Sequence, residues 1–212
     1  MKKRLPWINT IASIALSILI IILSLKFVNM SKELKRTQEV LGQQKLSSNQ
    51  LKDKNDAYTY YENLFLNKKL DSSMILKDLS ENTTSLRDLK ISKPTIILFI
   101  HQTHCSSCWS GAVDIVVKDF PEIAKQDMIV FTSYQNFRDI VIPLQELNLS
   151  SNVYNLVQGS FGEELEKINV PFAITTDSSL LIKHLIFIDM NLLSQFKSYV
   201  NAFEERKEQL TN

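Results

Sequence analysis

The sequence is short of cysteine, glycine and net charge, and each shortage narrows what the chain can be. Two cysteines among 212 residues are too few for a disulfide scaffold of the kind that holds small secreted domains together. A formal net charge of +1 provides no broad basic field, so nucleic acid is not an expected partner. Only four glycines, beside many Ile, Lys and Asn residues, are typical of a low-GC bacterial genome. The length leaves room for one ordinary domain and some additional segments.

The N-terminal segment has no charged residue from Leu5 to Leu25, directly after the basic run Lys2-Lys3-Arg4. An apolar run of about 20 residues is long enough to cross a bilayer as a helix, and Trp7 would lie at the level of the headgroups. No small-residue cleavage site and no cysteine directly follows the run, which argues against a cleaved signal peptide and excludes a lipoprotein anchor. We therefore expect residues 1–30 to be an uncleaved membrane anchor that crosses the membrane once.

The orientation of this anchor is less strongly encoded than the span. Basic residues precede the span, but Lys26, Lys32, Lys35 and Arg36 follow it and dilute the bias. A short basic tail ahead of a first apolar segment usually remains in the cytoplasm. The interpretation is therefore a protein of the bacterial inner membrane whose C-terminal domain is extracytoplasmic or periplasmic, where disulfides persist.

The segment 31–69 predicts a helical spacer next to the membrane. Its apolar residues recur only sparsely near multiples of seven, at Leu34, Leu41, Leu51 and Tyr58. A coiled-coil seam needs a denser repeat. We therefore expect a solvated spacer helix, with the globular domain occupying residues 70–212.

The order of elements in the domain is of the α/β type. We expect strands over 74–79, 83–86, 95–100, 128–132, 172–176 and 180–188, and helices over 109–118, 161–168 and 191–208. The stretch 136–147 is ambiguous, since a helix that begins near Arg138 would be interrupted by Pro143. This order predicts a mixed sheet in which a parallel pair is extended by an antiparallel hairpin, with helices flanking the sheet.

The two cysteines form a single Cys105-Ser-Ser-Cys108 motif between the strand that begins at Thr95 and the helix that begins near Trp109. The N-terminus of a helix carries free N–H groups and about half a positive charge, which favour thiolate over thiol. Thiolate is the species that attacks disulfides. The tiny loop closed by this spacing would add little stability, so a working dithiol accounts for the motif better than a structural staple.

The same cysteine pair is also compatible with a packing role or a metal-binding role. Free cysteines are often core filler. His101 and His104 lie close by, so His101, His104, Cys105 and Cys108 together could form a tetrahedral metal site. Haem attachment is excluded, because Trp109 rather than His follows the second cysteine. A third histidine, His184, lies in an apolar strand and is expected to be a core residue.

With these motifs in place, residues 70–203 resemble the thioredoxin superfamily, and in particular the membrane-anchored TlpA/ResA-like thiol-disulfide oxidoreductases of bacteria. The resemblance rests on Leu86-Arg87-Asp88-Leu89 followed by Pro94, on the apolar strand that leads into Cys-x-x-Cys, and on Val170-Pro171-Phe172 ahead of the final hairpin. It implies a thioredoxin-like fold. It also implies that Cys105 is the exposed attacking thiol and Cys108 the resolving thiol, and that no cofactor is required. Val170 and Pro171 would line the groove for a partner's extended segment, with the Val170–Pro171 peptide bond in the cis form.

The sequence departs from this family at several positions around the cysteines. His104 replaces the usual Trp, Ser106 and Ser107 replace the usual pair containing Pro, and the expected acidic positions hold Phe99 and Gly111. A protonated His104 beside Cys105 would stabilise the thiolate. The alternative is a loop histidine without a role in the chemistry.

Three hypotheses follow for function. The first is a membrane-anchored, extracytoplasmic thiol-disulfide oxidoreductase that exchanges electrons with cysteine pairs of partner proteins and with a membrane or periplasmic redox donor. The second is a metallochaperone or metal-binding module that uses Cys105, Cys108 and a nearby histidine. The third, a peroxidase of the peroxiredoxin type, ranks last because Leu98 and Gln102 occupy the positions where its Pro-x-x-x-Thr/Ser-x-x-Cys loop needs Pro and Thr or Ser.

Overall fold

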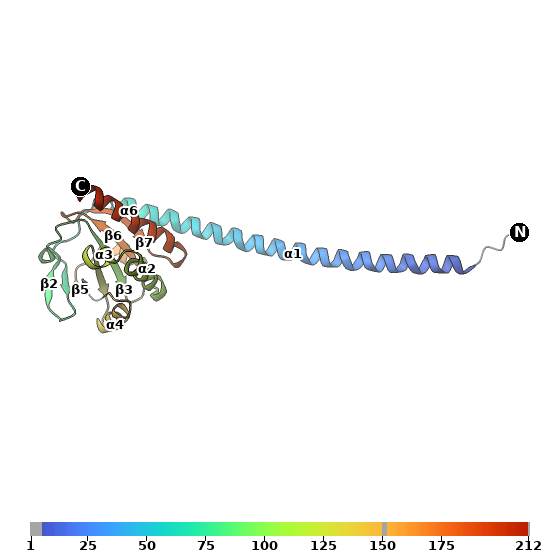
Figure 1. Cartoon of the computed structure of the whole chain (residues 1–212), viewed down its shortest axis with the longest axis horizontal. Coiled ribbons are helices and arrows are strands. Elements are labelled where there is room, and N and C mark those ends of the chain that lie inside the picture. The colour runs from blue at the N-terminus through green and yellow to red at the C-terminus, as the bar shows by residue number, and fades with distance from the viewer. Residues whose placement is uncertain (1–5, 150–151, 212) are drawn as a thin grey trace. The chain divides into compact units, whose positions relative to one another are not determined.

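The structure, a computed structural model, describes the backbone of residues 6–149 and 152–211, and it describes side chains from Leu23 onward except at 44, 46, 47, 51, 163 and 208–211. The chain divides into two compact units, residues 1–56 and 57–212. The first helix, α1 (Pro6–Phe65), begins in the first unit and ends in the second (Figure 1).

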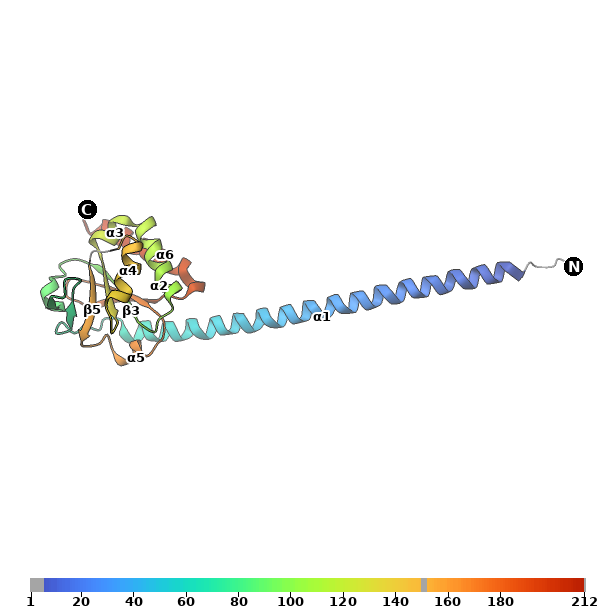
Figure 2. The same ribbon diagram turned by 90° about the horizontal axis from the view of Figure 1, so that it is seen from below.

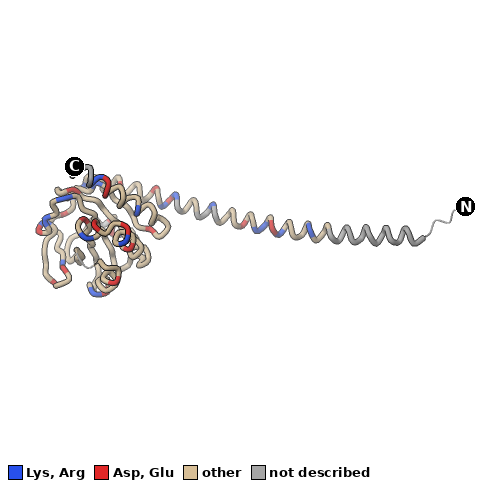
Figure 3. Tube along the Cα trace, viewed as in Figure 1, with Lys and Arg blue, Asp and Glu red and all other residues tan. Residues whose placement is uncertain are grey.

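The described backbone of the first unit is the part of α1 from Pro6 to Asp56. Basic and acidic residues are interspersed along its described part (Figure 3), and its apolar residues there, such as Phe27 and Leu34, are exposed. Within the described residues, none of the helices combines the length and the apolar composition needed to cross a membrane. The predicted span, Leu5 to Leu25, falls almost wholly outside the described side chains and stays a prediction.

The second unit is built on one mixed sheet. Its described strands are β1 (Ile75–Lys77), β2 (Thr83–Ser85), β3 (Thr95–His101), β4 (Met128–Ser133), β5 (Val153–Gln158), β6 (Phe172–Thr176) and β7 (Ile182–Phe187). They lie in the order β2-β1-β5-β4-β3-β6-β7. β3, β4 and β5 are parallel to one another, whereas β6 and β7 form an antiparallel hairpin that pairs with β3. The expected parallel pair and hairpin are confirmed, and this arrangement is a thioredoxin-like fold.

Helices cover both faces of the sheet. They are α2 (Ser106–Asp119), α3 (Pro121–Gln126), α4 (Arg138–Glu146), α5 (Glu163–Glu166) and α6 (Leu193–Thr211), with 3-10 turns η1 (Leu86–Leu89) and η2 (Met190–Leu192). Figure 2 shows α2, α3, α4 and α6 on one side of the sheet and α5 on the other. The helix expected over 161–168 is shorter than predicted: α5 is a single turn, Glu163–Glu166.

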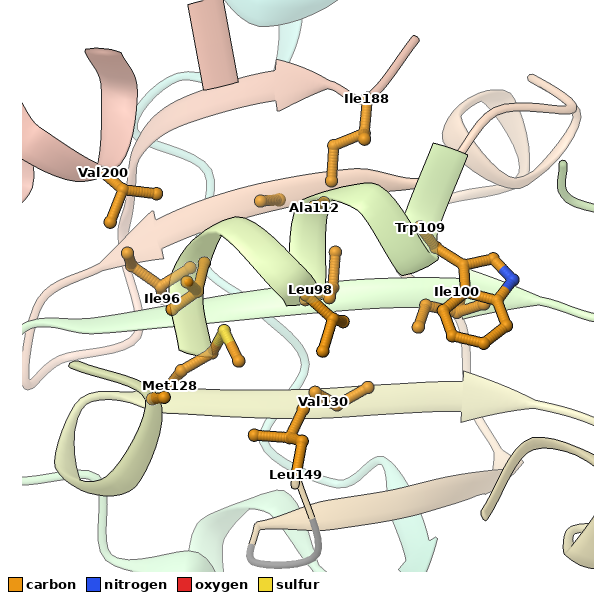
Figure 4. Packing of buried hydrophobic residues seen from close by; sticks show 14 of the residues in the cluster. Ile96, Leu98, Ile100, Trp109, Ala112, Met128, Val130, Leu149, Ile188 and Val200 are labelled. Atoms are coloured by element: carbon orange, nitrogen blue, oxygen red, sulfur yellow. The ribbon is translucent and has the colours of Figure 1, made fainter. Parts of the chain in front are cut away.

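β3 is an interior strand, between β4 and β6, and its side chains alternate between two cores. Ile96, Leu98 and Ile100 face α2 (Figure 4), and Ile97 and Phe99 face the opposite core that contains Phe172. Each of these five side chains is fully buried, and such burial stabilises a fold by about 1.5–3 kcal/mol per large apolar side chain. This burial holds β3 in place. The cysteines that follow it therefore lie at a fixed position, at the C-terminal end of the parallel strands.

Two local expectations are wrong. Pro143 does not interrupt a helix, since α4 runs through it from Arg138 to Glu146. The burial of Ile140 and Leu144 against the α2 side of the sheet holds the helix together despite the hydrogen bond that a proline cannot donate. His184 is not a core residue: its side chain is 37% exposed, and it contacts Arg206 and, at 3.9 Å, Glu62.

Candidate active site: the Cys105–Cys108 pair

A disulfide bond joins Cys105 and Cys108, whose Cα atoms lie 5.3 Å apart. β3 ends at His101, and Cys105 occupies the N-cap position of α2. Residues three apart on a helix lie on the same face one turn apart, so Cys-x-x-Cys at a helix start brings the two sulfur atoms within bonding reach. The strand-to-helix position expected for the pair is thus the one that the structure has.

The two cysteines differ in their environments. Cys105 is exposed, whereas Cys108 is only 7% exposed and belongs to the core beneath α2 with Trp109 and Ala112 (Figure 4 shows the latter two). The N-terminal N–H groups of α2 and the positive end of its dipole lie at Cys105 and favour negative charge there. An incoming thiol can therefore reach Cys105, while Cys108 is shielded.

The hydroxyl of Ser107 lies 3.2 Å from Sγ of Cys105. In a disulfide the sulfur atom carries no proton, so the hydroxyl is the donor in this contact. Sequence reasoning noted Ser107 only as a departure from the family pattern. The signal that could have found it is its place in the first turn of the helix, two residues after the exposed cysteine.

His104 is buried, with 6% of its surface exposed, although it immediately precedes the exposed Cys105. Its Nδ1 accepts a hydrogen bond from the backbone N–H of His101 at 2.9 Å, and its ring stands edge-on to Phe99 at 5.9 Å between centroids. Burial, together with the nearby His101, lowers the pKa of His104 from 6.5 to about 4. At neutral pH the ring is therefore uncharged, and it has no positive charge with which to stabilise a thiolate on Cys105.

A second loop flanks the cysteine loop. Thr103 donates a hydrogen bond from its hydroxyl to Oδ1 of Asn169 at 2.7 Å, and its backbone N–H donates to Nδ1 of His101 at 3.2 Å. Asn169 directly precedes Val170 and Pro171. The structure thus ties the loop before Cys105 to the loop before Pro171, a link that pattern reasoning missed because the two loops are far apart in the sequence.

Val170 and Pro171 lie beside the end of β3, because the β3–β6 register pairs Phe99 with Phe172. Val170 is half-buried and Pro171 is buried. The described residues contain no cis peptide bond, so the expectation of a cis-proline at Pro171 is wrong. Trans is the lower-energy form of an X-Pro bond by about 0.5–1 kcal/mol. In this form the carbonyl of Pro171 accepts the N–H of Ile188 at 2.7 Å.

The described residues contain no group of three or more His, Cys, Asp or Glu side chains that could hold a metal ion. The proposed set of His101, His104, Cys105 and Cys108 fails because His104 is turned into the protein and uses Nδ1 internally. The two sulfur atoms are also consumed by their own bond. This geometry does not favour the metal-binding alternative.

Phe99 and Gly111 occupy the two positions where the family that the sequence resembles usually has an acidic residue, and packing explains both residues. Phe99 is fully buried among Phe161 and Phe172, where an ionised carboxylate would be costly. At Gly111 an added Cβ would lie 2.9 Å from Cδ1 of Leu193, so a larger residue would require the Leu193 side chain to shift. The buried acid Asp127 precedes β4, at the other end of the sheet from Cys105, and pairs there with Lys93 at 2.6 Å and with Lys207.

No protein-family profile and no curated protein matches this sequence. Solved structures do match it. One is a candidate electron transfer protein from Aquifex aeolicus, with 21% identity and a TM-score of 0.48 over 65% of this chain and 91% of that chain. A second is the thioredoxin domain of a thiol-disulfide oxidoreductase from Bacteroides vulgatus, with 17% identity and a TM-score of 0.45 over 63% and 98%. A third is a thiol:disulfide interchange protein from Bacteroides sp., with 17% identity and a TM-score of 0.44 over 64% and 90%.

These TM-scores are low, so the fold assignment rests on the strand order and pairing of the chain itself. This strand order and pairing is the thioredoxin-like fold that the sequence led us to expect.

Proposed function

We propose that this protein is a thiol-disulfide oxidoreductase that exchanges electrons with cysteine pairs of partner proteins through Cys105 and Cys108. One observation carries the proposal: a disulfide at a helix N-terminus whose first sulfur is exposed and whose second is buried. An exposed sulfur can be attacked by, or can attack, a sulfur of another protein, and a buried neighbour can then resolve the mixed disulfide without competition from solvent thiols.

In the oxidising direction, the pair gains the two electrons that the partner loses. A thiolate of a partner dithiol attacks Sγ of Cys105, the Cys105–Cys108 bond breaks, and its electron pair leaves on Cys108. The second thiolate of the partner then attacks the partner sulfur that is bonded to Cys105, which closes the partner disulfide and releases Cys105 as a thiolate. In the reducing direction, the Cys105 thiolate attacks one sulfur of a partner disulfide and releases the other as a thiolate. The Cys108 thiolate then attacks Sγ of Cys105, re-forms the Cys105–Cys108 bond and releases the reduced partner.

The test uses two single variants of the full chain and a matched control. We expect Cys105→Ser to abolish reduction of a model protein disulfide, because the attacking atom is lost. Cys108→Ser should retain the first step and accumulate mixed disulfides, visible as a gel shift that a reductant reverses. Ser106→Ala, an exposed change between the cysteines, should keep most of the activity. Reduction at the wild-type rate by the Cys105→Ser protein would overturn the proposal.

We further propose that the chain is a bacterial inner-membrane protein with this domain outside the cytoplasm. The support is the uncharged run from Leu5 to Leu25 behind Lys2-Lys3-Arg4 and a dithiol whose disulfide form persists in oxidising compartments. In intact cells, a thiol reagent that does not cross the membrane should label reduced Cys105. Labelling only after lysis, or recovery of the full chain in the soluble fraction, would refute this location.

A further inference from the structure

The Ser107 side chain is placed to act on the reacting sulfur. Its hydroxyl lies 3.2 Å from Sγ of Cys105, whereas the hydroxyl of Ser110, one turn on, is directed to the carbonyl of Ser107 at 3.4 Å. Both Cys105 and Ser107 are exposed, so the contact is not forced by burial.

We propose that Ser107 donates its hydroxyl hydrogen bond to the Cys105 thiolate once the pair is fully reduced, and so stabilises the reduced form of the pair. This rests on the dithiol chemistry proposed above. A partner dithiol supplies the two electrons and becomes a disulfide. Cys108 is released in the first step and takes a proton from solvent, and Cys105 is released as a thiolate in the second step. A hydroxyl already in contact with this sulfur forms a stronger bond as the sulfur becomes an anion. Ser107 thereby sets both the fraction of attacking thiolate and the redox poise.

The two neighbouring histidines do not stabilise the Cys105 thiolate in place of Ser107. On its own loop, His104 is neutral at physiological pH because its pKa is about 4. His101 is engaged with Thr103. On the facing loop, Lys167 lies two residues before Asn169, and the first charged residue along α2 is Asp114, two turns beyond Cys108. Cys105 thus lies at the N-terminus of α2, with the Ser107 hydroxyl in contact with its sulfur atom.

The same contact affects the reduction potential. Whatever stabilises the thiolate stabilises the reduced pair, and so makes the disulfide a stronger oxidant. Loss of one hydrogen bond to a charged group should shift the equilibrium about tenfold, which equals about 30 mV for a two-electron couple.

The first measurement determines the pKa of the Cys105 thiol without interference from Cys108. In the full chain with Cys108→Ser, the rate of alkylation of Cys105 is followed against pH. We expect Ser107→Ala to move the midpoint upward by about one pH unit, corresponding to the tenfold effect. Ser107→Thr, which keeps the hydroxyl, should restore most of the shift, and Ser106→Ala should leave the midpoint in place.

The second measurement uses the protein with both cysteines, equilibrated with glutathione buffers above the alkylation midpoint. Ser107→Ala should have a potential more negative by about 30 mV, with the same thermal unfolding midpoint as wild type in the oxidised form. An unchanged alkylation midpoint in Ser107→Ala, or the same shift in Ser106→Ala, overturns the inference. Cys105→Ser tests the proposed oxidoreductase activity separately. If Cys105→Ser abolishes that activity but Ser107→Ala has no effect on the alkylation midpoint, the role of Ser107 is refuted and the proposed function is not.

Discussion

At the scale of single residues, the site is defined by what stands next to each sulfur. An exposed hydroxyl accompanies Cys105, and apolar side chains surround Cys108. The histidine before Cys105 faces the protein rather than the sulfur atoms, since its Nδ1 holds the backbone N–H of His101. It closes the loop in its neutral form, so its contribution is structural and sensitive to acid.

Protonation of His104 should therefore weaken the fold. Its pKa lies near 4 in the folded protein, below the ordinary 6.5. Between these values the unfolded chain binds a proton that the folded chain excludes, so the free energy of unfolding decreases as the pH falls through this window. The expected loss is about 2–3 kcal/mol, measured by urea unfolding at a series of pH values.

His104→Gln is the matched control for this acid effect. A glutamine oxygen can still accept the His101 N–H, but it does not titrate. The acidic groups elsewhere are common to both proteins, so the difference between the two pH profiles isolates the histidine. Equal slopes for His104→Gln and wild type between pH 6.5 and 4 would mean that burial does not suppress its protonation.

At the scale of elements, sequence patterns located the site better than they located the sheet. The apolar run of β3 and the Cys-x-x-Cys spacing depend on local sequence alone, and both could be predicted. β5 is absent from the strands that the sequence predicts, because Val153–Gln158 has little alternation and contains Asn155, a residue type that is rare in strands. Its partners, β4 and β1, come from distant parts of the chain.

Asn155 explains how this unpromising segment forms a strand. Its Oδ1 accepts hydrogen bonds from the Thr132 hydroxyl at 2.9 Å and the Tyr134 N–H at 3.0 Å, and its Nδ2 donates to the Tyr134 carbonyl at 2.9 Å. The side chain thus fastens β5 to the end of β4. Such a network follows from the tertiary pairing, so no local pattern could predict it.

Asn155→Ala should destabilise the domain by about 1–3 kcal/mol, because it leaves half-buried polar groups without partners. Chemical denaturation of the oxidised protein measures this. Asn201→Ala is the comparison: Asn201 makes one exposed side-chain bond, to Glu205 at 2.8 Å, and its loss should cost less than about 0.5 kcal/mol. Equal small effects from the two substitutions would show that the Asn155 network does not hold β5.

At the scale of the whole molecule, the globular unit begins inside α1, at Ala57. Tyr58 stacks on Phe187 with ring centroids 4.5 Å apart, and Phe65 is only 5% exposed in the core opposite α2. The backbone N–H of Asn67 donates to the carbonyl of Ile182 at 2.7 Å, which ties the chain after α1 to β7. The last turns of this helix are therefore part of the fold that supports the site.

A chain that starts at Ala57 should accordingly unfold with nearly the full-length stability, whereas one that starts at Leu70 should lose at least about 3 kcal/mol, because Phe65 alone leaves a large cavity. Urea unfolding of the two truncated proteins gives the comparison. In the full chain, Phe65→Ala should reproduce most of the loss, and Tyr60→Ala, at a residue 62% exposed, should change little. If the proteins that begin at Ala57 and Leu70 were equally stable, the end of α1 would be a tether only, and the cysteine pair would be held by the sheet and α2 without it.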